Sequence, residues 1–470
     1  MKKILSLFFF IVSGCMFFAC TDDTDITPDS ETFVQDNLEE VTDARVVNHS
    51  EVQRVLKNFQ PIAQLTKSLS RSSEPEVVFN AEGNPSMYVF NFPQGGFVVI
   101  SAVKDLYPVL AYNTEGSFDT NAEIPGFSAW IKDVNTLTEN PAEINPDSIQ
   151  ACRRMWRVYE KAAVLRIPMG RDWKPGMIDE AEYQALQKIF ADSVSSWNAK
   201  NIPVYYLDDI KKDYPDKYEY YNDLAKSSIW PEYEPVYQQF SVVVERSKVY
   251  TDNNVTLIKT KWNQNGGFNQ TFGPRGTNLT NAYAGCVPVA AGQIMYYHKW
   301  PSKYNWAGMP LTFGTTTTSN FLLDLALQGN AEFTDTATRV STRQIKNVIQ
   351  NNGYTCDYKE WNSGSENALK NNIKNNQPAL LANKEHAIVL GGYSELEILT
   401  VFELWTFMDV RRFRDVVSDV TNHFYANSFF ISWGWGGKND GFYSNLSNIY
   451  VNNKESYQPL VYIYNIKPNK

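Results

Sequence analysis

The sequence predicts an α+β fold made of more than one domain, and three observations lead to this prediction. A hairpin signature lies in the N-terminal third, helical stripes fill the middle, and the C-terminal half joins a helix to several strand-like runs. The chain has 470 residues, which is long enough for about two to four domains of ordinary size.

Composition excludes several classes of protein. The net charge of −9 argues against a protein that coats nucleic acid. Apolar residues make up 43% of the chain and charged residues 20%, and this composition excludes a chain that is disordered throughout. Five cysteines without a CxxC pair argue against a dense disulfide scaffold or a zinc site. Four histidines leave little room for a multi-histidine metal site, so we expect no metal and no cofactor.

The first element, residues 1–20, reads as a bacterial lipoprotein signal peptide. Two lysines precede a short apolar run that ends at Cys20, and an acidic spacer follows over residues 21–45. Cys20 is the predicted lipid attachment site, because it opens directly onto the spacer; Cys15 is the alternative, and an ordinary secretory signal is another. We therefore expect an exported, outer-membrane or cell-surface lipoprotein of a Gram-negative-type bacterium, or one released after processing, with the membrane contacted through the lipid alone.

The next element, residues 46–142, is predicted to be a small α+β domain. Ser50 is a candidate N-cap, with Gln53 three residues later and helical spacing beyond it. Strand-like runs at 87–92 and 97–101 flank a Pro-Gln-Gly-Gly turn, which is a hairpin signature, and a helix is expected around Trp130.

Residues 143–245 are predicted to be a helical connector that contains the processing region. Apolar positions lie on helical stripes among charges, and 213–234 reads as an exposed link. From residue 246 to 470 charge thins, and glycine, asparagine and aromatic residues increase. An apolar and charged stretch at 396–414 resembles an amphipathic lid or a partner surface.

Cys286 is the strongest candidate for a nucleophile. It follows Gly285 and precedes a predicted helix with Pro288 in its first turn, so the thiol would lie at a helix N-terminus that favours the thiolate. Gly285 would let a substrate backbone approach closely. A buried structural cysteine on an apolar helix is the competing interpretation of this segment taken alone.

His386 is the candidate base, because it begins a strand-like run after a short turn. His49 lies in the first domain, and His298 is twelve residues after Cys286 on the same helix, about 18 Å away along its axis. His423 lies in a charged stretch read as helical. Core packing would explain His386 equally well on its own.

Two further blocks complete the pattern. Trp-Asn-Gln ends at Gln264, whose amide could stabilise an oxyanion, and Trp-Gly-Trp-Gly-Gly begins at Trp433 and leads to Asp-Gly-Phe. The order of these blocks with Gly-Cys-Val…Gln-Ile-Met-x-Tyr-His and Gln-Pro…His-Ala-x-Val resembles the streptopain family, papain-like cysteine peptidases that bacteria make as zymogens. The resemblance covers roughly 250–470, and 45–140 also resembles that family's inhibitory propeptide.

This resemblance implies a papain-like catalytic domain, with a helical part and an antiparallel sheet or barrel, over 246–470, and an inhibitory prodomain over 46–142. It implies that Cys286 is the nucleophile and His386 the general base. The Gln264 amide and the Cys286 N–H would form the oxyanion hole, and Trp433 would shield the His386 ring. The expected function is an endopeptidase acting on proteins or peptides, with the prodomain as an intramolecular inhibitor.

The sequence departs from the family pattern at several positions. Ile431 stands where papain relatives place an asparagine, so a Cys–His dyad is expected in place of a triad, and Lys384 and Glu385 replace a Gly-Gly before the histidine. Two other functions therefore stay open at this point. One is an amidase that acts on cell-wall peptides, and the other is a non-catalytic lipoprotein that uses the fold for binding.

Overall fold

The computed structural model describes residues 45–66, 74–144, 146–157, 159, 180–200, 202–213, 215–227, 241–273, 281–334, 337–383, 386–409, 412–413, 417–444 and 461–470. The predicted signal peptide, Cys15, Cys20 and nearly all of the spacer lie outside these described residues. Among the helices described, none combines the length and apolar character that crossing a membrane requires.

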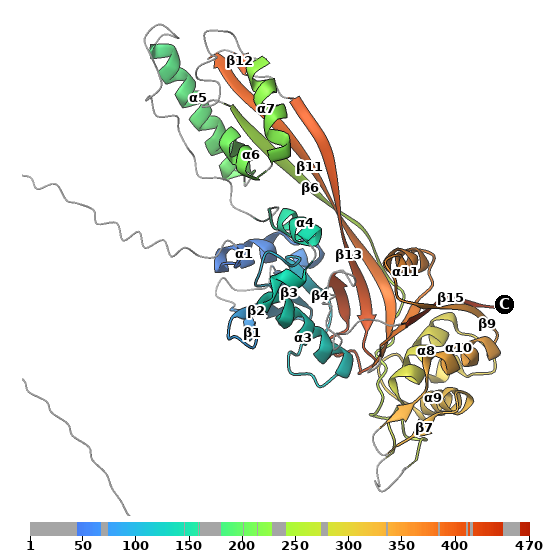
Figure 1. Cartoon of the computed structure of the whole chain (residues 1–470). Coiled ribbons are helices and arrows are strands. Elements are labelled where there is room, and N and C mark those ends of the chain that lie inside the picture. The colour runs from blue at the N-terminus through green and yellow to red at the C-terminus, as the bar shows by residue number, and fades with distance from the viewer. Residues whose placement is uncertain are drawn as a thin grey trace, which may run out of the picture. The chain divides into compact units, whose positions relative to one another are not determined.

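The N-terminal part is a four-stranded antiparallel sheet with helices packed on it (Figure 1). The elements are α1 (His49–Asn58), α2 (Ala63–Thr66), β1 (Glu76–Phe79), β2 (Pro85–Asn91), β3 (Phe97–Ser101), β4 (Val109–Asn113), α3 (Pro125–Glu139) and α4 (Pro146–Arg157). The predicted hairpin is therefore present as β2 and β3. The predicted N-cap at Ser50 is wrong: Asn48 caps α1, in a capping box with Glu51, because its side chain reaches the Glu51 N–H at 3.0 Å.

The prodomain sheet continues into the C-terminal sheet. Strand β4 pairs with β14 (Gly441–Ser444) through Tyr112 opposite Phe442 and Ala111 opposite Tyr443. The order then runs β14-β13-β11-β10-β15-β9, all antiparallel. These strands are β9 (Tyr354–Glu360), β10 (Ala379–Ala382), β11 (Ala387–Asp409), β13 (Val417–Ser432) and β15 (Val461–Pro468).

A helical layer packs on one part of this sheet. It consists of α8 (Cys286–His298), α9 (Thr316–Gln328) and α10 (Thr342–Asn351), with the short strands β7 (Glu332–Phe333) and β8 (Thr338–Arg339) beside them; α11 (Ser365–Lys374) packs on β11. The helices share a buried core with β10 and β15 in which Trp262, Leu322 and Ile463 are nearly inaccessible to water. A helical part and an antiparallel sheet thus make up the C-terminal region, and the predicted α+β class is confirmed.

The stretch predicted as a lid is the outer half of a long β-hairpin. Strands β11 and β13 pair from Val389 opposite Ser432 to Leu404 opposite Val417, and β12 (Arg412–Phe413) pairs with β11 near the tip. His423 lies in β13, so its assignment to a helix is wrong. The physical reason is the long-range pairing, since short apolar runs alone do not separate a strand from a helix.

The connector supplies the partner for this hairpin. Strand β6 (Ser241–Thr256) pairs along β11, and β5 (Val204–Tyr206) pairs with β6. The helices α5 (Glu180–Ala199), α6 (Leu207–Asp213) and α7 (Pro215–Ser227) lie beside the outer half of the hairpin in Figure 1. Helix α7 replaces most of the exposed link predicted over 213–234, because Tyr221 is fully buried against Leu404 and its neighbours.

Two predicted boundaries therefore move. The boundary at 245/246 falls inside β6, which is one continuous strand. Helix α4 packs with the prodomain, where Trp156 donates to the Leu106 carbonyl at 2.8 Å and Arg153 pairs with Asp105 at 2.8 Å, so the boundary at 142/143 separates residues that fold together.

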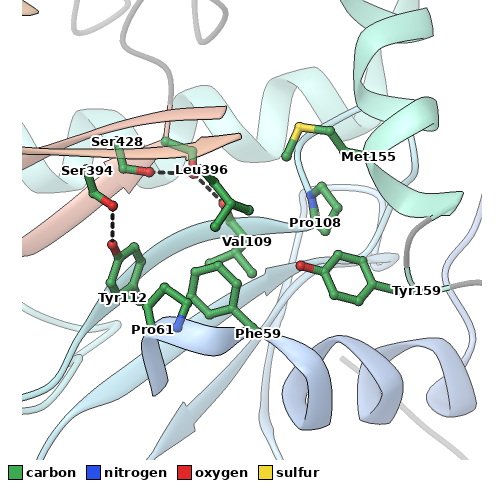
Figure 2. A pocket seen from close by; sticks show the side chains of 11 residues that line it. Phe59, Pro61, Pro108, Val109, Tyr112, Met155, Tyr159, Ser394, Leu396 and Ser428 are labelled. Carbon is green, nitrogen blue, oxygen red and sulfur yellow. Dashed lines mark hydrogen bonds between the residues drawn. The ribbon is translucent and has the colours of Figure 1, made fainter. Parts of the chain in front are cut away.

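A small cavity of about 20 Å³ lies where the prodomain meets the hairpin (Figure 2). Tyr112 of β4 donates to the Ser394 hydroxyl of β11 at 2.9 Å across this junction. The Phe59 ring packs edge-on against Tyr112 at 5.0 Å, and Leu396 belongs to the same buried cluster. A cavity of this size holds about one water molecule, so the junction is closely packed.

Candidate active site

Cys286 is the first residue of α8, as the sequence predicts. The helix that follows is buried along most of its length, with Ala290, Ala291 and Ile294 almost without exposure, so its start is held rigidly against the core. The sulfur is a partly buried free thiol. It lies at the positive end of the helix dipole and within reach of the Val287 N–H, both of which favour the thiolate.

Gly285, the N-cap of α8, has φ of +85°, a conformation that a residue with a side chain rarely adopts. A Cβ there would lie 2.4 Å from the carbonyl oxygen of Thr338 in β8. The close approach that requires glycine is therefore made by this chain's own backbone. Gly285 also borders the cleft that contains Cys286, so its close approach to a substrate backbone stays a prediction.

His386 stands immediately before β11, at the end of the turn from β10. The Asn383 side chain accepts a hydrogen bond from the His386 N–H at 2.7 Å, and the Asn383 N–H donates to the His386 carbonyl at 3.0 Å. The ring is buried, with 4% exposure, and its Nε2 lies 2.9 Å from the Trp433 carbonyl oxygen. Because a carbonyl only accepts, Nε2 carries a proton, and Nδ1 is left to face the thiol.

The structure brings Cys286 and His386 together in one hydrogen-bonded pair. Burial raises the pKa of Cys286, but the hydrogen bond and positive charge of His386 outweigh it, and the pKa of the thiol falls below its ordinary value. Burial lowers the pKa of His386, but Cys286 and the Trp433 carbonyl outweigh it, and this pKa is raised. Both directions favour a thiolate–imidazolium pair.

Trp433 supports His386 through its backbone carbonyl. Its fully buried ring packs on Phe127 of α3 at 5.8 Å and on Tyr443 at 5.4 Å. The indole N–H lies 3.1 Å from the Asn439 carbonyl. The expected contact between Trp433 and His386 thus exists through the Trp433 main-chain oxygen, and the Trp433 ring anchors this loop against α3.

Gln264 lies beside the start of α8. Its carbonyl accepts from the Ala284 N–H at 2.8 Å, and its own N–H donates to the Asn263 side chain at 2.7 Å. These contacts fix Gln264 next to the loop that leads into Cys286. Its side chain borders the same cleft as Cys286 and His386, where an amide N–H can reach an oxyanion.

The pair lies in an open cleft of about 1020 Å³. The cleft is bordered by residues of α8, β7, β8, β10, β11 and the Trp433 loop; those nearest the chemistry include Gln264, Tyr283, Val287, Thr338, Ala387 and Trp435. Two prodomain residues, Glu123 and Pro125, border it at the start of α3. The N-terminal domain therefore reaches the mouth of the cleft.

Sequence reasoning missed Asn383, which fixes the turn at His386, and Asp440, which holds the Trp433 loop. Asn383 lies three residues before His386, a spacing typical of side-chain-stabilised turns, and this signal could have identified it. The sequence presents Asp440 only as the first residue of the Asp-Gly-Phe block, with no signal that it contacts Trp433. Lys384 and Glu385 lie outside the described residues. Among the described His, Cys, Asp and Glu side chains, no group of three is arranged to hold a metal ion.

Two segments of this chain match known protein families. The Spi protease inhibitor family matches residues 44–137, and the Peptidase C10 family matches residues 262–320. The chain is 26% identical over 235 residues to the thiol protease/hemagglutinin PrtT of Porphyromonas gingivalis. That match covers 40% of this chain and 23% of PrtT, so the chain spans about a quarter of the length of this relative.

Two solved structures from Prevotella intermedia are also similar. A prointerpain A fragment matches with 13% identity and a TM-score of 0.44, over 83% of this chain and 96% of the fragment. Active interpain A cysteine protease matches with 12% identity and a TM-score of 0.30, over 45% of this chain and 94% of that one.

The inhibitor match covers the region that the sequence predicts as a prodomain, and the C10 match contains Gln264 and Cys286. These matches support the resemblance to the streptopain, or C10, family: a segment like the Spi protease inhibitors precedes a segment like the C10 cysteine peptidases, as in a zymogen.

Proposed function

We propose that this protein is an endopeptidase that cleaves protein or peptide substrates through a Cys286 thioester, after its inhibitor domain has been removed. The observation that carries the proposal is the pair of Cys286 and His386, whose pKa values shift toward thiolate and imidazolium. The open cleft around this pair is large enough for several residues of an extended chain.

The reaction begins when the Cys286 thiolate attacks the carbonyl carbon of the peptide bond. A C–S bond forms, and the oxygen becomes an anion that the Gln264 amide and the Cys286 N–H stabilise. The C–N bond then breaks, and His386 gives its proton to the leaving amine. In the second half, His386 takes a proton from water, the resulting hydroxide attacks the thioester, and the C–S bond breaks to release the acid and restore the thiolate.

The direct test is hydrolysis of denatured casein by the processed protein and by Cys286→Ala. We expect hydrolysis by the first and none by the second, because no other group replaces the sulfur nucleophile. Undiminished casein hydrolysis by Cys286→Ala would exclude the proposal. Release of fragments from purified peptidoglycan without any cleavage of casein would point instead to a cell-wall amidase.

We also propose that the protein is exported and anchored through a lipid on Cys20. The basis is the sequence of residues 1–20 alone, with an apolar run that ends at a cysteine and an acidic spacer after it. Cys20→Ala should move the protein from the detergent phase to the aqueous phase of expressing bacteria, and Cys15→Ala should not. The opposite pattern would place the lipid on Cys15, and no change with either variant would contradict the anchor.

A further inference from the structure

The loop that holds the His386 ring is itself held by a buried carboxylate. Asp440 is 4% exposed, and its Oδ1 accepts a hydrogen bond from the Trp433 N–H at 2.9 Å. The carbonyl of the same Trp433 accepts from His386 Nε2 at 2.9 Å. One residue of backbone therefore separates the carboxylate from the catalytic imidazole.

The network extends to the helix that carries the nucleophile. Gln293 lies on α8, seven residues after Cys286, and donates through Nε2 to the Ser432 hydroxyl at 3.0 Å. The Ser432 hydroxyl in turn bonds to Asp440. Since Gln293 supplies the donor to the Ser432 oxygen, the Ser432 proton is free to point at the carboxylate, so an ionised Asp440 accepts from both Ser432 and Trp433.

The turn that carries Asp440 is fixed from several sides. The Trp433 indole N–H lies within 3.1 Å of both the Asn439 carbonyl and the Tyr443 hydroxyl, and Tyr443 donates to that carbonyl at 2.6 Å. Charged and titratable groups that act on Asp440 are Lys261, which favours its ionised form, and Tyr443. Burial raises the pKa of Asp440 to about 7, although the Trp433 N–H and Ser432 act to lower it.

We propose that Asp440 is the positioning residue for His386, in the place of the asparagine that Ile431 does not supply. Its carboxylate fixes the Trp433 peptide group, and the carbonyl of that peptide sets the orientation of the imidazole and the nitrogen that faces Cys286. Gln293 and Ser432 connect the Asp440 carboxylate to α8. The same buried carboxylate therefore helps to hold both the helix that carries Cys286 and the loop that orients His386. The catalytic importance of this role rests on the proposed function. The alkylation test below does not, because it requires no substrate.

The test is the rate of Cys286 alkylation by iodoacetamide as a function of pH, on the full-length chain, together with kcat and KM after processing. Asp440→Ala should move the low-pH limb of the alkylation profile upward by about one pH unit and lower kcat about tenfold or more, with KM nearly unchanged. Asp440→Asn keeps an oxygen that can accept from the Trp433 N–H, so it should recover most of this loss. Asp357→Ala, an exposed aspartate on β9, is the matched control.

A wild-type alkylation profile for folded Asp440→Ala, or equal loss in Asp440→Asn and Asp440→Ala, would overturn the inference. If Asp440→Ala does not fold, Ser432→Ala decides, because it removes one of the two donors to the carboxylate and should give a smaller shift in the same direction. A wild-type profile for Ser432→Ala would then overturn it. Alkylation reads the thiol–imidazole pair without any substrate, so failure of peptide hydrolysis with a normal profile would contradict the proposed function alone.

Discussion

Burial and pairing act in opposite directions on the two residues at the centre of the site. Removing Cys286 and His386 from water disfavours their charged forms, whereas each charged form stabilises the other. The N-terminus of α8 stabilises the thiolate and the Trp433 carbonyl stabilises the imidazolium, so both favour the ion pair. A thiolate is thereby available at a pH where an ordinary cysteine is mostly protonated.

This balance predicts the pH dependence of alkylation. In the wild-type chain the alkylation rate should rise with pH as the Cys286 thiol loses its proton. The midpoint of this rise should lie below the ordinary thiol pKa of about 8.5. His386→Ala removes the main cause that lowers the Cys286 pKa and leaves burial opposed only by the Ala387 and Val287 N–H groups, so the midpoint should move upward by about one unit or more. The measurement is the iodoacetamide rate by mass spectrometry of the peptide that contains Cys286.

Cys152 and Cys356 serve as internal controls for this measurement. Burial raises the pKa of Cys152 to about 12 and that of Cys356 to about 11, so both should react slowly over the whole range. An unchanged Cys286 midpoint in His386→Ala would contradict the pairing.

Gly285 permits a second prediction at the residue scale. Gly285→Ala adds a methyl group 2.4 Å from the Thr338 oxygen and places a side chain at φ of +85°. Gly83 has a similar φ of +82° with nothing within 4 Å, so Gly83→Ala isolates the conformational cost. We expect Gly83→Ala to lower the free energy of unfolding by about 1 kcal/mol and Gly285→Ala by clearly more. Urea denaturation in a Cys286→Ala background measures both, and equal losses would contradict the steric account.

At the scale of elements, the hairpin and the connector form one substructure. Val242 and Val244 of β6 share a core with Phe190 of α5, while Val243 faces Tyr221 and Leu404 on the other side. The alternation follows from the two faces of a strand. The connector therefore packs on the peptidase sheet along both faces of β6, and it is more than a tether between the two domains.

This packing predicts what remains with the peptidase after the chain is cut. Two protease sites, one inserted within residues 160–179 and one between Ser227 and Ser241, separate the connector from the prodomain and from the peptidase. After cleavage at both sites, α5, β5, α6 and α7 should stay bound to the peptidase in gel filtration. Val243→Asp places a charge in a core position with no exposure and should release the fragment. If the fragment dissociates without that substitution, the β5–β6 pairing and the two hydrophobic cores on the faces of β6 do not hold the connector on the peptidase.

The hairpin also shows where prediction from sequence ends. Cys286 was placed correctly because the Gly-Cys-x-Pro start of a helix is a local signal, and β2 and β3 were found because their turn is local. The outer halves of β11 and β13 were not, because β11 pairs there with β6, some 150 residues earlier, and with β13. Asn383 and Asp440 were missed for the same reason: their roles depend on contacts that only the folded chain creates.

At the scale of the whole molecule, one sheet joins the inhibitor domain to the peptidase. The prodomain adds β4 to the edge strand β14, and α3 covers the loop that positions His386. Asn113 donates to the Asp440 carbonyl at 2.6 Å, and Asn439 bonds to both backbone groups of Asp119. The N-terminal domain thus contacts the loop that supports His386 as well as the mouth of the cleft.

Trp130 is the residue through which this docking is best tested. Its ring is 3% exposed and packs edge-on against Tyr443 at 5.1 Å. Trp130→Ala should weaken the docking by about 3 kcal/mol or more, and so speed self-processing and the labelling of Cys286 by a thiol-directed epoxide. Lys132→Ala, on the exposed side of α3, should leave both rates unchanged. Equal rates in the two variants would contradict inhibition through this contact.

The central claim is that Cys286 performs the chemistry in a chain that carries its own inhibitor. Intact mass spectrometry of the full-length protein after incubation, with and without a thiol-directed epoxide, tests it most directly. We expect the wild-type chain to lose the prodomain and to gain one epoxide on the Cys286 fragment, and Cys286→Ala to stay full length and unlabelled. Processing of Cys286→Ala at the wild-type rate in the absence of any other peptidase would contradict it.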